Sequence, residues 1–166
     1  YTYQIALVYR ERIEAEGETL ILFKLSDRVR SGQATVLLPV QLLTPVQRSE
    51  DVDPKDVRFT WLSTEGANAY RVQVSTDPTF PRERTFVSNE ILTTVAGGSP
   101  LSTDRINLET ALLNRLGLVG QRVPLYWRVG ARNLGDSPGP VPDANGLRYV
   151  WSRPFEFTTQ ELPPSP

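Results

Sequence analysis

Residues 59–75 read Phe-Thr-Trp-Leu-Ser-Thr-Glu-Gly-Ala-Asn-Ala-Tyr-Arg-Val-Gln-Val-Ser and contain two apolar runs around a short turn. In each run an apolar side chain recurs at every second position: Phe59 and Trp61 before the turn, and Tyr70, Val72 and Val74 after it. A period of two is typical of a strand with one buried face. The stretch therefore predicts two strands whose apolar faces meet in the core of an antiparallel sandwich.

Two later stretches carry the same kind of aromatic-rich pattern: 126–132, Tyr-Trp-Arg-Val-Gly-Ala-Arg, and 151–159, Trp-Ser-Arg-Pro-Phe-Glu-Phe-Thr-Thr. Together with 59–75 they resemble the fibronectin type III domain of bacterial secreted or cell-surface multidomain proteins. The resemblance implies an all-β, immunoglobulin-like sandwich of two sheets over residues 38–160. We expect its core to contain Trp61, Tyr70, Val72, Val74, Trp127, Val129, Phe155 and Phe157.

A short helix is predicted as an insertion in this sandwich, over residues 107–117. Asn107 can cap its first turn, apolar residues follow at helical spacing, and Gly117 ends it. In the family that the chain resembles, the tyrosine of the tyrosine corner falls at Leu125. Leucine has no hydroxyl group, so we expect the helix to secure this corner instead.

The remaining stretches give weaker signals. Residues 84–88 and 90–95 are predicted to be short strands, 97–100 a turn, and the strand pairing between 77 and 104 stays open. The loop over 133–146 is rich in proline and glycine, and we expect it to project from one end of the sandwich.

Residues 1–37 are predicted to form a β-hairpin that precedes the sandwich. The run 1–10 alternates, 10–18 is charged, and 19–25 is again apolar. Because 1–7 aligns with 125–131 and 25–26 with 151–152, we interpret the hairpin as the last two strands of an upstream domain of the same kind. Its uncovered apolar face would then bind a partner through Tyr1, Tyr3, Ile5, Leu7 and Tyr9.

Composition removes several kinds of chemistry. The 166 residues include no Cys, His or Met and carry a net charge of −1. Thiolate nucleophiles, histidine-based triads and thiolate or imidazole metal ligands are excluded. No basic field for nucleic acid exists, and the longest apolar run, 35–43, is shorter than the about 20 residues that a membrane span needs.

Carboxylates cluster in three places but match no known ligand pattern. Carboxylate oxygens are ligands that Ca²⁺ prefers, but those in the turn over 50–56 and in the long loop lack the spacing of an EF-hand: Glu50, Asp51, Asp53, Asp56, Asp136 and Asp143. In an extended strand Glu14, Glu16 and Glu18 would line one face, on a hairpin tip with no cleft. We interpret all of them as solvated side chains and predict no metal, cofactor or catalytic residue.

Two aromatic residues near the end, Tyr149 and Trp151, are predicted to be partly exposed. They could stack on sugar rings, which makes Trp151 a further partner-binding candidate. The alternative is a cation–π contact with Arg128 and Arg132 on the outward face of the neighbouring strand.

The resemblance implies a non-catalytic structural or interaction module of a secreted or cell-surface protein. Its expected partners are neighbouring copies or adjacent domains of the same protein, joined by strand complementation into oligomers or a filament. The alternative is a carbohydrate-binding accessory module of a secreted glycoside hydrolase, with a polysaccharide as partner. A start at Tyr1 and a proline-rich end, 161–166, predict a piece of a longer chain with a linker after it.

Overall fold

A computed structural model describes residues 8–15, 18–25, 36–136 and 139–161. The first two ranges form the predicted hairpin, in which β1 (Val8–Ala15) pairs antiparallel with β2 (Glu18–Leu25). Val8 lies opposite Leu25 at one end, and Ala15 lies opposite Glu18 at the other. Of the five residues proposed for the hairpin's apolar face, only Tyr9 lies within the described strands; Tyr1, Tyr3, Ile5 and Leu7 lie outside the described residues.

The expected row of Glu14, Glu16 and Glu18 on one strand is wrong. The chain reverses direction between Ala15 and Glu18, so Glu14 pairs with Thr19 and Glu18 belongs to the second strand. Glu16 lies outside the described residues.

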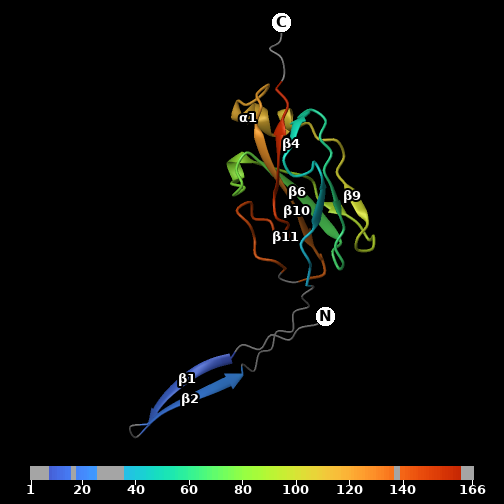
Figure 1. Ribbon diagram of the computed structural model, residues 1–166. Helices are drawn as coiled ribbons and strands as arrows, with labels where there is room; N and C mark the ends of the chain where they lie inside the picture. Colours follow the sequence, from blue (N-terminus) through green and yellow to red (C-terminus); the bar gives the residue numbers. More distant parts are fainter. Residues whose placement is uncertain (1–7, 16–17, 26–35, 137–138, 162–166) are drawn as a thin grey trace.

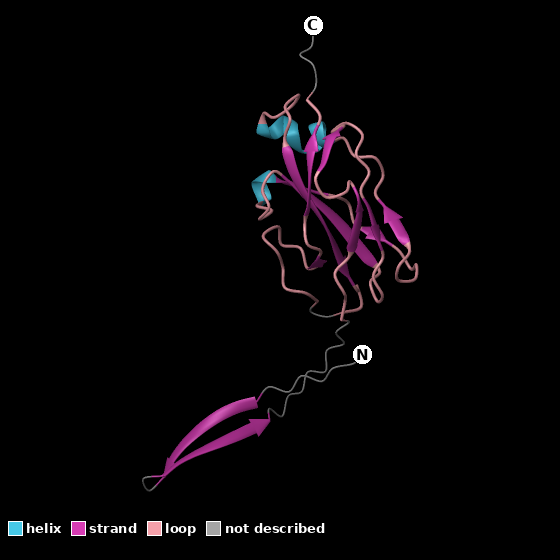
Figure 2. Ribbon diagram, in the orientation of Figure 1, coloured by secondary structure: helices cyan, strands magenta, loops and turns pink. Residues whose placement is uncertain are grey.

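The rest of the described chain is a sandwich of two sheets, as expected from the alternating runs (Figure 2). The small sheet has the order β3-β5-β9, with β3 over Gln41–Thr44, β5 over Thr60–Leu62 and β9 over Pro100–Ser102. The large sheet has the order β4-β12-β10-β6-β7, with strands at Ser49–Val52, Phe155–Thr159, Pro124–Arg132, Ala69–Ser75 and Thr85–Val87. Two short strands extend it: β8 (Ile91–Leu92) pairs with β6, and β11 (Val150–Trp151) pairs with β10.

The chain passes repeatedly from one sheet to the other. Strand β3 belongs to the small sheet, β4 to the large, β5 to the small, and β6, β7 and β8 to the large. The chain then returns to the small sheet at β9 and ends in the large sheet with β10, β11 and β12. Neighbouring strands are antiparallel except for β4, which runs parallel to β12. Consecutive strands on opposite sheets place residues 59–62 and 69–75 face to face across the core, as their alternation predicted.

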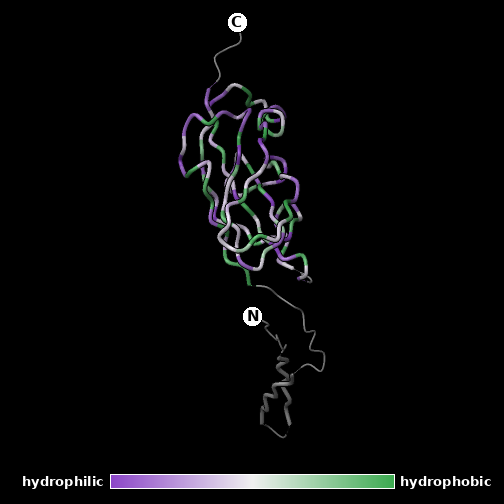
Figure 3. The backbone as a smooth tube through the Cα atoms, turned by 90° about the vertical axis from the view of Figure 1, so that its right-hand side faces the viewer, coloured by the Kyte–Doolittle hydropathy of each residue, from purple (hydrophilic) through white to green (hydrophobic). Residues whose placement is uncertain are grey.

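The core lies between the sheets and is built around aromatic rings. Trp61, Tyr70 and Trp127 are fully buried, and so are the predicted valines and Phe157. Phe59 lies 4.9 Å from Trp127, centroid to centroid, and Trp61 lies 5.9 Å from Tyr70. The Trp127 Nε1 group donates a hydrogen bond to the Pro45 carbonyl at 3.2 Å. In Figure 3 hydrophobic and hydrophilic segments alternate along the sandwich.

One predicted core residue is placed differently. Phe155 is only partly buried and meets Trp127 edge-on at 6.1 Å. Within the aromatic-rich stretch 151–159, strand structure is interrupted between Trp151 and Phe155, where Pro154 lies. Phe155 therefore packs at the border of the core instead of inside it.

The helix insertion is present where the sequence placed it. Asn107 Oδ1 accepts a hydrogen bond from Thr110 N at 3.1 Å, a π-helical turn η2 follows over Glu109–Leu113, and α1 covers Asn114–Leu116. Gly117 ends the helix with φ of 69°, a left-handed conformation that glycine adopts without strain. Leu112 and Leu113 share the core cluster with Leu125. The helix therefore packs into the same core cluster as the start of β10.

The weakly predicted region between 77 and 104 is partly as expected. The stretch 84–88 contains β7, and a one-turn 3₁₀ helix, η1 (Arg82–Arg84), precedes it. Only Ile91 and Leu92 of the run 90–95 form a strand, and β9 was not predicted. Turn residues occur at 97–98, within the expected turn.

The sandwich is entered and left at opposite ends. Figure 1 shows the described segment that begins at Val36 at one end and the segment that closes at Glu161 at the other, beside α1. No helix among the described residues is long and apolar enough to cross a membrane.

Candidate functional site

Polar and aromatic side chains gather on the outer face of the large sheet. Strand β10 alternates between the core and this face, and β6 does the same beside it, with Val129 opposite Val72 and Arg128 opposite Gln73. Inner positions are fully buried apolar residues. The outer positions carry Arg71, Gln73 and Arg128, and the segment that leads into β11 covers them.

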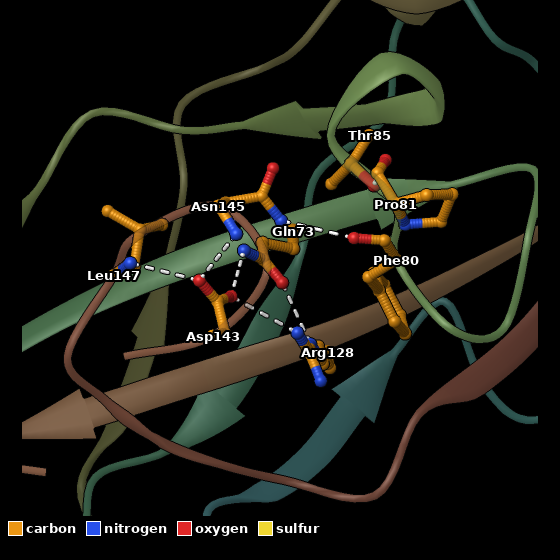
Figure 4. Close-up of polar contacts among 8 residues, drawn as sticks. All are labelled: Gln73, Phe80, Pro81, Thr85, Arg128, Asp143, Asn145 and Leu147. Carbon is orange, nitrogen blue, oxygen red and sulfur yellow. Dashed lines mark hydrogen bonds and ion pairs between the residues drawn. The ribbon is translucent and has the colours of Figure 1, made fainter. Parts of the chain in front are cut away.

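Asp143 is the centre of this cover (Figure 4). Its Oδ2 atom accepts hydrogen bonds from Gln73 Nε2 at 2.8 Å and from Arg128 Nη2 at 3.2 Å, while its Oδ1 atom accepts from the backbone N–H groups of Asn145 and Leu147, both at 2.9 Å. Arg128 Nε donates to Gln73 Oε1 at 2.8 Å, which closes the network. The side chains of Arg128 and Asp143 are only 18% and 10% exposed.

The hydrogen bonds of Asp143 contradict two predictions made from the sequence, one about the long loop and one about Asp143 itself. The second half of the long loop does not project from the end of the sandwich, because Asp143 ties it back onto the large sheet. Asp143 is also not a solvated turn carboxylate: its lone pairs are used by two side chains and two backbone donors. Burial of a carboxylate is tolerated when a cation and several hydrogen bonds compensate for lost water.

An aromatic and cationic stack lies beside the network. The guanidinium carbon of Arg128 is 4.1 Å from the Phe80 ring centroid and 4.5 Å from that of Trp151, so the cation contacts both rings. The predicted cation–π contact to Trp151 is thus confirmed for Arg128. Arg132 lies instead over Tyr149, at 5.7 Å, and Tyr149 packs against Trp151 at 5.6 Å.

Gly130 makes room for these rings. A Cβ atom at this position would lie 2.6 Å from Tyr149 Cβ and 2.8 Å from Trp151 Cε3, much closer than van der Waals contact. Tyr149 is 4% exposed, not partly exposed as expected, whereas Trp151 retains intermediate exposure. Among the described residues nothing accepts a hydrogen bond from Trp151 Nε1.

Tyr149 links the stack to a second arginine. Arg71 Nε donates to Tyr149 Oη at 3.2 Å, and the Tyr149 hydroxyl donates to Glu90 Oε1. Burial, together with the hydrogen bond to Glu90, raises the pKa of the Tyr149 hydroxyl. Burial lowers the pKa of the Arg128 guanidinium, because it disfavours the charged form, and the charge of Asp143 opposes that shift. Most of this outer layer is therefore internally paired.

A depression of about 440 Å³ adjoins this layer and was not predicted from the sequence. Three arginines from three elements line it: Arg71 on β6, Arg82 in η1 and Arg115 in α1. The other lining residues are neutral: Thr85, Phe86, Val87, Ala111, Asn145 and Leu147. Since these arginines are far apart in the sequence and none belongs to a motif, no sequence signal groups them.

The carboxylates of the 50–56 turn have individual partners. Arg122 donates to Glu50 Oε2 at 2.8 Å and to Asp51 Oδ1 at 2.9 Å, and Arg105 pairs with Asp56. Asp53 Oδ1 accepts from the backbone N–H of Lys55 at 2.9 Å. Across the part of the chain that the structure describes, no three Asp, Glu, His or Cys residues come together as a metal-binding group.

The proposed partner-binding residues are not brought together in the described structure. Trp151 lies on the large sheet, Tyr9 lies in the hairpin, and the other four precede the described range. Comparison of the chain with protein-family models, with characterised proteins and with solved structures finds no match.

Proposed function

We propose that this chain is a non-catalytic structural and interaction module of the fibronectin type III-like, immunoglobulin-like class, within a larger secreted or cell-surface protein. Two packed sheets with repeated crossovers between them are the architecture that such domains share. The observation that carries the proposal is the position of the ends: the sandwich is entered at one pole and left at the other (Figure 1). Modules of this kind can follow one another in a row.

The outer face of the large sheet supports a structural role. Its charged groups interact with one another: Arg128 pairs with Asp143, and the Tyr149 hydroxyl bridges Arg71 and Glu90. A catalytic pair needs a group with a reactive proton or lone pair that faces substrate. Here Asp143 already accepts four hydrogen bonds from the protein itself.

The hairpin provides the interaction part of the proposal. Strands β1 and β2 form a sheet of two strands and pair only with each other among the described strands. A two-stranded hairpin is marginally stable in water, whereas three or more strands with an apolar face can be stable. Each strand has one edge whose backbone N–H and C=O groups lack a strand partner, and such edges add to other sheets.

We therefore propose that the hairpin completes the sheet of an adjacent domain or of a second copy. The sandwich offers matching edges at β7 and β4 of the large sheet and at β3 and β9 of the small one. If each hairpin joins the next copy, the contact is head-to-tail, and it gives a ring or a filament according to its rotation.

Light scattering tests the assembly. We expect the full chain to form species larger than a monomer, with a mass that rises with concentration, because the hairpin finds a free edge on another copy. A shortened chain that begins at Leu38 keeps every strand of the sandwich and is expected to stay monomeric. Monomers for both chains at high concentration would refute strand complementation.

A second candidate, the carbohydrate-binding accessory module, depends on Trp151. This ring retains intermediate exposure beside Tyr149, and aromatic faces stack on sugars. Titration with soluble polysaccharides, followed by tryptophan fluorescence, separates the two candidates. Saturable binding that is lost in Trp151→Ala would favour the carbohydrate module, whereas the structural proposal expects no such binding.

A further inference from the structure

The three-arginine depression differs from the rest of the outer layer in the balance of its charges. Arg128, Arg122 and Arg105 each pair with a carboxylate. In contrast, no aspartate or glutamate lines the depression that holds Arg71, Arg82 and Arg115. No carboxylate among the lining residues pairs with these arginines where they converge.

The hydrogen bonds of two of these arginines fix their positions without neutralising them. Arg71 Nη1 donates to the Ser88 carbonyl at 3.2 Å and its Nε donates to the Tyr149 hydroxyl. Arg115 Nη2 donates to the Thr85 carbonyl at 2.6 Å. All these acceptors are neutral, although the Tyr149 hydroxyl in turn donates to the Glu90 carboxylate, and each guanidinium group has five N–H donors. Both side chains are held in place and retain donors for a ligand.

Arg82 is the most available of the three. It is exposed on η1, and within the described residues it has no hydrogen bond or ion pair, although Glu83 follows it in the chain. Glu83 does not line the depression. The largely buried carboxylate on this face, Asp143, pairs with Arg128. An exposed, unpaired guanidinium group that lines the depression is available to bind an anion.

We propose that this depression binds an oxyanion group, a phosphate or a sulfate ester, on a small ligand. Arg71 and Arg115 would form a fixed base for the anion, and Arg82 would complete its coordination. Guanidinium groups bind such anions with paired, charge-assisted hydrogen bonds. A volume of about 440 Å³ also lies in the range of small-molecule sites. The partly buried Phe86 and Leu147 offer apolar contact to the remainder of the ligand.

Calorimetric titration of the full chain tests the proposal, with inorganic sulfate and inorganic phosphate as probes. Glucose 6-sulfate and glucose 6-phosphate distinguish the two ester types, and glucose is the neutral control. Ionic strength is kept constant with sodium chloride, because salt screens exposed charges. We expect binding of the charged probes and none of glucose. Equal responses to glucose and to its charged esters would overturn the proposal.

Substitutions locate the site. Arg82→Gln and Arg115→Gln are each expected to weaken binding of the tighter ester by about fivefold to tenfold, the effect of losing one charge-assisted pair. Arg58→Gln is the matched control, since Arg58 is exposed on the same chain and does not line the depression. We expect it to change affinity less than about twofold because distant exposed charges are screened.

Arg82→Gln removes no hydrogen bond or ion pair within the described protein, so its fold should be intact, which a urea midpoint equal to that of the parent would verify. Equal affinity in the parent, Arg82→Gln and Arg58→Gln would place any bound anion elsewhere and refute the assignment. The strand-complementation proposal is tested by light scattering on unsubstituted chains, so the two can fail independently.

Discussion

Side chains on both faces of β10 are buried, but by different kinds of neighbour. On the inner face Leu125, Trp127 and Val129 are fully buried by the apolar residues of the opposite sheet. On the outer face Arg128 is covered as well, but by a loop, with Asp143 and Gln73 as polar partners and the rings of Phe80 and Trp151 in contact with the cation. One strand therefore contributes to an apolar core and to a second, polar layer.

The comparison shows what each kind of burial demands. Apolar residues in the core need only shape and contact, and any well-placed apolar neighbour suffices. The polar layer needs specific partners, because a buried charge without them costs free energy. The two layers should therefore respond to substitution with different magnitudes and through different mechanisms.

The largest effect is expected in the inner layer. Trp61→Ala should lower the free energy of unfolding by about 3–5 kcal/mol, because it removes a fully buried ring and leaves a cavity beside Tyr70. Urea unfolding followed by circular dichroism measures the change. Trp151→Ala, from the partly exposed outer ring, should cost less. A Trp61→Ala variant as stable as the parent would show that the ring is not part of the core.

Breaking the polar layer comes next. Arg128→Met keeps the length of the apolar stem but leaves the nearly buried Asp143 without its cation, and we expect a loss of roughly 2–3 kcal/mol. The matched control is Arg122→Met, whose partners Glu50 and Asp51 are well exposed, and which should cost less than about 1 kcal/mol. Equal losses in the two variants would mean that burial does not distinguish these ion pairs.

A smaller effect is expected from added volume between the layers. Gly130→Ala would place Cβ against Tyr149 and Trp151, and we expect a loss of about 1–2 kcal/mol with a shift in tryptophan emission as the Trp151 ring moves. Chemical unfolding and fluorescence of the native state report the two changes. If neither changes, the rings do not pack on this glycine.

The smallest effect is a dependence on alkaline pH. The folded-state pKa of Tyr149 is raised, so the neutral hydroxyl is favoured in the native protein. Its contribution is fully present below the unfolded-state pKa of about 10 and is lost as pH rises through the higher folded-state pKa. Burial also raises the pKa of Tyr70, which makes stability depend on pH in the same direction.

We therefore expect the urea midpoint to fall between about pH 8 and pH 11, and to fall less in Tyr149→Phe, which has no hydroxyl to ionise. Each variant is compared with itself at the two pH values, so the hydrogen bonds lost in Tyr149→Phe do not enter the comparison. An equal fall in parent and variant would show that Tyr149 ionises in the folded protein as it does in the unfolded one.

Local pattern accounts for most of the fold that was predicted. Alternation identified the faces of residues 59–62 and 69–75, and a capping Asn107 with a terminal Gly117 identified the helix. These signals are contained within a few neighbouring residues, so they can be recognised without knowledge of distant ones. The short strand β9 was missed because three residues carry no measurable period.

The sequence by itself determined which side chains are apolar and on which face of each strand they lie, and that was enough for the sandwich and the inner layer. The outer layer was decided by the tertiary structure. Asp143 meets Gln73 across 70 positions and Arg128 across 15, and Arg71, Arg82 and Arg115 meet only because β6, η1 and α1 border one depression. Electrostatic and hydrogen-bonding partners are chosen by distance in space, and no period in the chain records that distance.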